Sequence, residues 1–251
     1  MPLPVRRAGN PMLNEKTFSS LPRPGIGVEQ MSLKGTIDKS FLMLIVLMAA
    51  ALWPWSQMAG GNLQTASATM TVGFLGGFVL ALIISFKPAM AAYLSLPYAA
   101  LEGLALGGIS AIFNVRYPGI AIQAVGLTFA VLGVLLIAYR TRLIRVTDHF
   151  RAMVVGATFG IMLLYLATMV LSWFHVSMQA LYAPTPLGIG ISLVIVAVAA
   201  LNLVLSFDLI ERGVMGGAPK YMEWYGAFGL MVALVWLYVE MLRLLSLTRR
   251  S

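Results

Sequence analysis

Two carboxylic acids, Asp208 and Glu223, flank the turn of the last apolar hairpin of the chain, residues 187–247. Asp208 follows 56 residues, 152–207, that include no Asp, Glu, Lys or Arg. An ionisable side chain at the end of so long an apolar run is costly and indicates a functional site. With the turn near residues 215–217, the two acids are expected at similar heights on antiparallel helices, ~10 Å from the turn at about 1.5 Å per residue.

Two kinds of chemistry are open to this pair of acids. Carboxyls that face each other in a low dielectric cannot both ionise easily, so they would share a proton and act as a pH-sensitive latch. Carboxylate oxygens are also the ligands that Ca²⁺ prefers, so Asp208 and Glu223 predict a weak calcium site. The structural alternative is an interfacial ion pair of Asp208 with Arg212, four residues later, or with Lys220.

Glu102 lies nearest the middle of an apolar run, about 11 residues or ~16 Å from the start of its span. Tyr98 lies one turn earlier on the same face. We expect either a protonated acid bonded to a neighbouring helix or a group on a proton or ion path, because burial favours the neutral carboxyl. Glu240 is a further acid near the end of the last run, and its spacing from Arg243 predicts an ion pair at the outer surface.

The elements that position these acids follow from composition. Of the 251 residues, 60% are hydrophobic and 10% are charged, against about 25% charged in soluble domains. A helix needs roughly 20 apolar residues to cross a bilayer, and it satisfies its backbone polar groups internally. The sequence therefore predicts an all-α polytopic membrane protein with seven transmembrane helices, at 41–55, 69–86, 91–113, 119–139, 152–173, 187–208 and 222–245.

Residues 1–36 are polar and contain several prolines, so they are expected to form a cytoplasmic tail that is partly disordered. Residues 37–248 are the predicted seven-helix transmembrane domain, and 249–251 are its carboxyl-terminal end. The segment before the first span and the loops after the second, fourth and sixth spans hold 13 of the 17 Lys and Arg residues. By the positive-inside rule, the amino terminus is cytoplasmic and the carboxyl terminus lies outside.

The net charge of +8 is thus a signal of topology. Lipid headgroups are its expected partners. The basic residues form no stripe with interleaved aromatics, so nucleic acid is not an expected partner. The chain has no cysteine, which excludes disulfides and thiolate catalysis. No pairing of a nucleophile with a base is evident, so neither an enzyme nor a cofactor is expected. The compact loops and the lack of a transit peptide favour a bacterial inner membrane.

Three of the predicted spans carry pairs of glycines at helical spacing. Such pairs let helix backbones approach closely, so they predict tight packing within the bundle. A homo-oligomer interface is the alternative. The pairs are Gly73 with Gly77, Gly103 with Gly107, and Gly156 with Gly160.

Several segments resemble the Bax inhibitor-1/YccA family of small integral membrane proteins. Three of them lie in the last hairpin: Phe207-Asp-Leu-Ile-Glu-Arg-Gly213, Gly217-Ala-Pro-Lys-Tyr-Met-Glu-Trp-Tyr225 and Leu234-Val-Trp-Leu-Tyr-Val-Glu-Met-Leu-Arg-Leu-Leu245. Residues 98–110, with a Leu-Glu-Gly-Leu core, and residues 10–18 are similar to a bacterial branch of the family.

The resemblance implies a seven-helix bundle with the carboxyl-terminal helix at its centre, and a pH-sensitive calcium leak. Two aspartates on the last two helices would form the latch. Asp208 matches the first, whereas the second falls on Ala233 or Glu240 depending on the residues aligned, so Glu223 and Glu240 both stay open as its partner. A second activity implied by bacterial relatives is non-catalytic regulation of a membrane-bound ATP-dependent protease or a stress-response partner.

Overall fold

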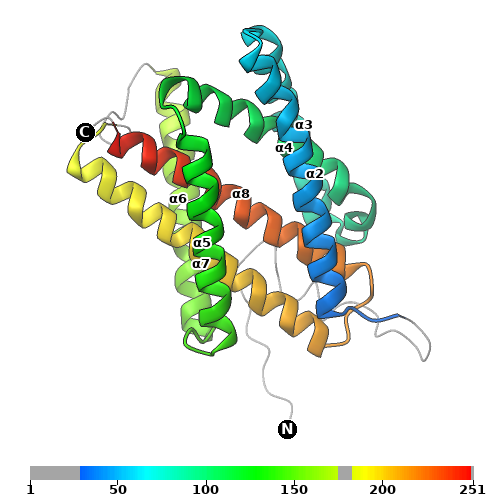
Figure 1. Ribbon diagram of the computed structural model, residues 1–251. Helices are drawn as coiled ribbons and strands as arrows, with labels where there is room; N and C mark the ends of the chain where they lie inside the picture. The colour runs from blue at the N-terminus through cyan, green and yellow to red at the C-terminus, as the bar shows by residue number, and fades with distance from the viewer. Residues whose placement is uncertain (1–28, 175–182, 250–251) are drawn as a thin grey trace.

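The computed structural model describes residues 29–174 and 183–249, and within them seven long helices make up nearly the whole structure (Figure 1). Each is long and apolar enough to cross a membrane, which confirms the predicted all-α, seven-span architecture. Residues 1–28 of the predicted tail and residues 250–251 lie outside the described part. The helices are α2 (Leu33–Ala59), α3 (Leu63–Phe86), α4 (Ala91–Arg116), α5 (Ile120–Arg140), α6 (Asp148–Trp173), α7 (Pro186–Met215) and α8 (Met222–Thr248), and a 3₁₀ turn, η1 (Pro88–Met90), precedes α4.

The first helix is longer than predicted at both ends. It begins at Leu33 because Ser32 caps it: the Ser32 hydroxyl accepts a hydrogen bond of 3.0 Å from the backbone N–H of Gly35. It then continues through Pro54 to Ala59, so the Trp-Pro-Trp sequence is not its end. The predicted start at residue 41 was too late because Lys34, Asp38 and Lys39 occupy the first two turns of α2, and charged residues are not expected within an apolar span.

The turn of the last hairpin also differs from the prediction. Helix α7 continues about two turns beyond Asp208, whereas α8 begins one residue before Glu223. The prediction that the two acids lie at similar heights is therefore wrong. Residues 216–221 leave the helical conformation because Gly217 adopts a φ of 65°, which favours glycine, and Pro219 has no N–H to donate.

Helix α8 packs against α2, α4, α5 and α7. Helices α7 and α8 form an antiparallel hairpin and lie side by side (Figure 1). Helix α3 lies mainly against α4, and α6 mainly against α7. Most of the buried core lies along α4, α7 and α8. Residues from the start of α8 are therefore enclosed by several other helices.

The glycine pairs of α3 and α4 pack as predicted. A methyl group at Gly103 or Gly107 would collide with the backbone carbonyl oxygens of Leu47 and Ala51 on α2. A methyl group at Gly73 would meet the carbonyl oxygen of Leu101 at 2.5 Å. Helices α2 and α3 thus approach α4 closely through backbone contacts.

The glycine pair of α6 behaves differently. A side chain built at Gly156 or Gly160 meets no atom within 4 Å, and both positions are exposed. The prediction of packing within the bundle is wrong for this pair, because α6 turns the face that carries it away from α7. A homo-oligomer interface at this face stays a prediction.

Candidate functional site: carboxyl clusters of the last hairpin

The segment before α2 lies against the loop between α7 and α8. The backbone N–H of Met31 donates to the carbonyl oxygen of Ala218 at 2.7 Å, and the N–H of Lys220 donates to that of Glu29 at 3.1 Å. The Met31 side chain is 3% exposed and belongs to the core. These two backbone hydrogen bonds place Ser32, at the start of α2, directly over the start of α8.

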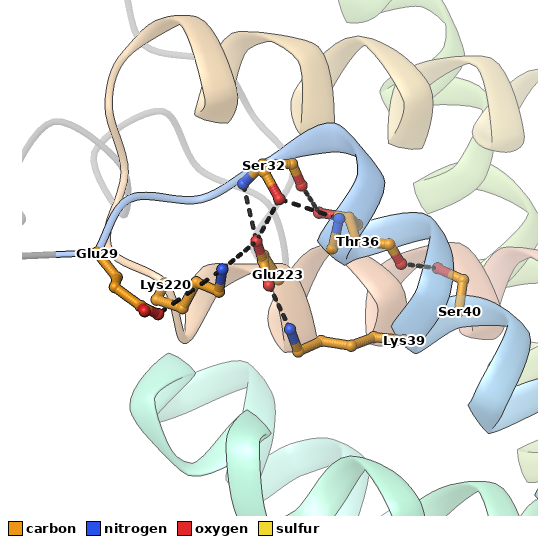
Figure 2. Close-up of polar contacts among 8 residues, drawn as sticks. Glu29, Ser32, Thr36, Lys39, Ser40, Lys220 and Glu223 are labelled. Atoms are coloured by element: carbon orange, nitrogen blue, oxygen red, sulfur yellow. Dashed lines mark hydrogen bonds and ion pairs between the residues drawn. The ribbon is translucent and has the colours of Figure 1, made fainter.

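Glu223 lies beneath this segment and is completely buried, with a relative exposure of 0%. Its Oε1 accepts hydrogen bonds of 2.8 Å from both the backbone N–H and the hydroxyl of Ser32. Its Oε2 accepts a hydrogen bond from Nζ of Lys39, and Nζ of Lys220 lies 3.5 Å from Oε1 (Figure 2). We call Ser32, Lys39, Lys220 and Glu223 the Glu223 cluster.

A glycine makes this arrangement possible. A Cβ at Gly35, in the first turn of α2, would collide with the carboxyl group of Glu223. Lys39 lies one turn further along the same face, and its Nζ lies 5.4 Å from the centre of the Trp224 ring, within the range of a cation–π contact. The small residue at position 35 therefore lets α2 approach α8 closely enough for Lys39 to reach the acid.

Asp208 lies in a second cluster, on α7. Its Oδ2 accepts a hydrogen bond of 2.7 Å from Arg151 on α6 and lies 2.8 Å from Nε of Arg212, one turn later on α7. The side chains of Asp208 and Arg151 are each 13% exposed, whereas that of Arg212 is 38% exposed. We call Arg151, Asp208 and Arg212 the Asp208 cluster.

The structure thus pairs each acid of the predicted latch with cations. Asp208 contacts Arg212, which is the ion pair given as the structural alternative, while Lys220 contacts Glu223 and Glu29. The polar contacts found among residues 29–174 and 183–249 join neither carboxyl to the other. Both acids lie toward the loop that connects α7 to α8. Each links this hairpin to a different helix: Glu223 to α2 and Asp208 to α6.

Glu102 of α4 lies against α3. Its Oε1 lies next to Gly77 of α3, so close that a Cβ at that glycine would be 3.0 Å away. Tyr98, one turn before Glu102, is 2% exposed and packs its ring at an angle of 73° against Phe228 of α8, with 4.9 Å between ring centres. The predicted path residues therefore connect α3, α4 and α8.

Glu240 forms the predicted ion pair with Arg243, and the pair is buried within the protein. Its position at the outer surface of the membrane stays a prediction. Glu240 is 3% exposed, and its Oε2 lies 3.6 Å from an Arg243 nitrogen. The Tyr165 hydroxyl of α6 donates to Glu240 Oε1 at 2.5 Å and accepts from Arg243 at 2.7 Å. Glu240 lies far along α8 from Glu223, because 17 residues, or ~26 Å, separate them at about 1.5 Å per residue.

No group of three or more His, Cys, Asp or Glu side chains that would suit a metal ion occurs within residues 29–174 and 183–249. The carboxyl oxygens instead accept hydrogen bonds from, or form ion pairs with, Lys, Arg, Ser and Tyr side chains. This donor set suits a carboxylate held by hydrogen bonds and cations, and it leaves few free carboxyl oxygens for a metal ion.

Sequence reasoning missed Ser32, Gly35, Lys39, Arg151 and Tyr165. The position of Lys39 in the sequence could have identified it, because it is the last cation before 47 uncharged residues. Ser32 carried a weaker signal, because a serine before an apolar run is typical of a helix cap. The contacts of Arg151 and Tyr165 depend on how α6 packs, and the sequence gives no sign of that.

Comparison with known proteins agrees with the resemblance in sequence. A family model described as Bax inhibitor 1 like matches residues 10–250. Comparisons with curated proteins and with solved structures gave no match. The matched region includes all seven helices and both carboxyl clusters.

Proposed function

We propose, on the premise that this chain belongs to the Bax inhibitor 1 like family of integral membrane proteins, that it is a pH-sensitive cation leak channel without catalytic activity. Calcium is the proposed cargo. In this proposal, protonation of carboxyls in the Glu223 and Asp208 clusters gates the path. The proposed location is the bacterial inner membrane, with the amino terminus in the cytoplasm and the carboxyl terminus outside.

The burial of Glu223 is the observation that supports this proposal most. An acid with no exposed surface, two hydrogen bonds from Ser32 and two ammonium neighbours fixes the segment before α2 on the start of α8. A neutral carboxyl attracts Lys39 and Lys220 far less than a carboxylate does. Protonation would therefore weaken the attachment of α2 to the end of the last hairpin.

The Asp208 cluster supports the same mechanism on the other face of the hairpin. Arg151 ties α6 to α7 through Asp208. A proton on Asp208 would weaken this ion pair, and α6 has few other partners because it packs mainly against α7. In the proposed open state, the α7–α8 hairpin is released from α2 on one side and from α6 on the other.

The oxygen atoms of the released carboxyls would then line the path of the permeating ion. Ca²⁺ prefers oxygen ligands. A path with few acids would bind Ca²⁺ weakly, which suits passage of the ion better than tight binding. Glu102, between α3 and α4, is the proposed acid further along the path, and Tyr98 lies beside it on α4.

The test is calcium flux into proteoliposomes at about pH 5 and about pH 8. The full chain is compared with Asp208→Asn, Glu223→Gln and Glu102→Gln. We expect greater flux at the lower pH, and loss of pH dependence in the variant that lacks the gating carboxyl. Asp38→Asn is the matched control, because Asp38 is an exposed acid on the first turns of α2.

A folded protein that passes no calcium at either pH would overturn the channel proposal. The second candidate, a regulator that binds a membrane protease or a stress-response partner, would then take its place. One observation favours it: the polar tail continues directly into residues 29–32, which cover Glu223. Deletion of residues 1–28 keeps Ser32 in place, so loss of partner capture without loss of flux would separate the two functions.

A further inference from the structure

A crevice of about 370 Å³ opens between α2 and α5, in the half of the bundle toward which α8 runs. Helices α2 and α5 form its walls, and α4 and α8, against which both of them pack, form its floor. Trp55 of α2 and Ala121 of α5 lie toward the outer ends of the walls, because α2 ends and α5 begins nearby. Leu44 and Phe129 lie at the inner end.

The lining of the crevice is apolar, and the hydroxyl groups in it have partners. Ser110 of α4 and Tyr238 of α8 lie 2.6 Å apart and hydrogen-bond to each other. The Thr128 hydroxyl donates to the carbonyl oxygen of Ala124 at 2.8 Å. A site with satisfied polar groups gives a water molecule too few partners to bind. The crevice is therefore suited to a hydrocarbon occupant.

The walls of the crevice also face the surface of the bundle that lipid would cover. Met48 and Leu52 on α2 are 51% and 67% exposed, and Ile122 on α5 is 77% exposed. From Leu44 to Trp55, α2 rises ~16 Å at about 1.5 Å per residue, which is roughly half of the ~30 Å hydrocarbon core of a bilayer. The length of the crevice thus matches the acyl region of one leaflet.

The cation Arg249 lies beside the start of α5, which forms the outer end of one wall of this crevice. Arg249, directly after α8, donates to the carbonyl oxygen of Pro118 at 2.9 Å and to the side-chain oxygen of Gln123 at 2.8 Å. Gln123 is adjacent in sequence to Ile122 in the wall, and Arg249 is exposed. An arginine at the level of the headgroups attracts phosphate and holds it by hydrogen bonds.

We propose that this crevice is a binding site for one anionic phospholipid, with an acyl chain between α2 and α5 and the headgroup phosphate near Arg249. The site lies at the opposite end of the bundle from the Glu223 cluster, so it goes beyond the proposed gating function. Bound lipid would fill the gap between α2 and α5.

The test uses the full chain in nanodiscs that contain phosphatidylglycerol with a diazirine near the end of one acyl chain. After illumination, mass spectrometry locates the labelled residues. We expect label on the crevice walls that unlabelled phosphatidylglycerol competes away. Val125→Trp, which fills the crevice from α5, should reduce this label severalfold, whereas Leu136→Trp, on a lipid-facing part of the same helix, should leave it unchanged.

Met48→Trp fills the crevice from the other wall at a half-exposed position, so it keeps the test valid if Val125→Trp does not fold. For the headgroup, Arg249→Gln should lower the preference for phosphatidylglycerol over phosphatidylcholine about fivefold. Lys87→Gln, at the other end of the bundle, should not change that preference. Label spread evenly over all helices, equal label from both lipids, or α2-to-α5 crosslinks between two copies of the chain would each overturn the proposal.

Discussion

Ser32 donates two hydrogen bonds of 2.8 Å to the same oxygen of Glu223, which lies 191 residues later in the chain. One donor is its backbone N–H and the other is its hydroxyl. The same hydroxyl accepts from the N–H of Gly35 and so caps α2. A single side chain thus starts the first helix and attaches it to the last.

Ser32→Ala should reduce the free energy of unfolding by about 1–3 kcal/mol, because the substitution removes both a helix cap and a hydrogen bond to a charged group. Unfolding in mixed micelles, followed by circular dichroism, measures this change. Ser56→Ala is the control: its exposed hydroxyl donates to the carbonyl oxygen of Trp53 in the same helix, so we expect a change within about 0.5 kcal/mol. Equal effects of the two substitutions would contradict the role of Ser32.

Gly35→Ala should destabilise the protein by about 1–3 kcal/mol, since the new methyl group forces Glu223 away from α2. Gly133→Ala should instead stabilise the protein. A side chain at Gly133 meets no atom within 4 Å, and alanine favours a helix by up to about 1 kcal/mol over glycine. The thermal midpoints of the two purified variants decide the question, and a midpoint for Gly35→Ala at or above that of the unmodified protein would argue against the close approach.

Asp208 should be coupled more strongly to Arg151 than to Arg212, although both lie within 3 Å of the same oxygen. Arg151 is 13% exposed and Arg212 is 38% exposed, so water screens the second pair more. Double-mutant cycles of Asp208→Asn with Arg151→Gln and with Arg212→Gln measure the two coupling energies. We expect the Arg212 pair to give less than about 1 kcal/mol. A larger coupling to Arg212 would show that α6 is not held by this contact.

Tyr165→Phe should destabilise the protein by about 1–3 kcal/mol, because it removes the hydroxyl that joins Glu240 to Arg243 in a buried site. The measurement is again unfolding in micelles. Tyr93→Phe serves as the control, since Tyr93 is 76% exposed. If the two variants unfold alike, the hydroxyl of Tyr165 does not stabilise the contact between α6 and α8.

The sequence by itself determined the fold class and the number of spans. Long uncharged runs leave the backbone one means of satisfying its polar groups in a membrane, which is the helix. It also determined the short-range contacts: Asp208 with Arg212 and Glu240 with Arg243 both follow from helical spacing. The glycines of α3 and α4 were found in the same way.

Only the tertiary structure decided the long-range partners. The sequence places Glu223 near a turn, but its burial depends on residues 29–32 crossing to the loop at 218–220. The exact end of α7 also decided whether the two acids face each other, because a shift of a few residues moves a side chain by a helical turn. Helical periodicity gives the face of a residue on its own helix, whereas the helix that covers this face depends on how all seven pack.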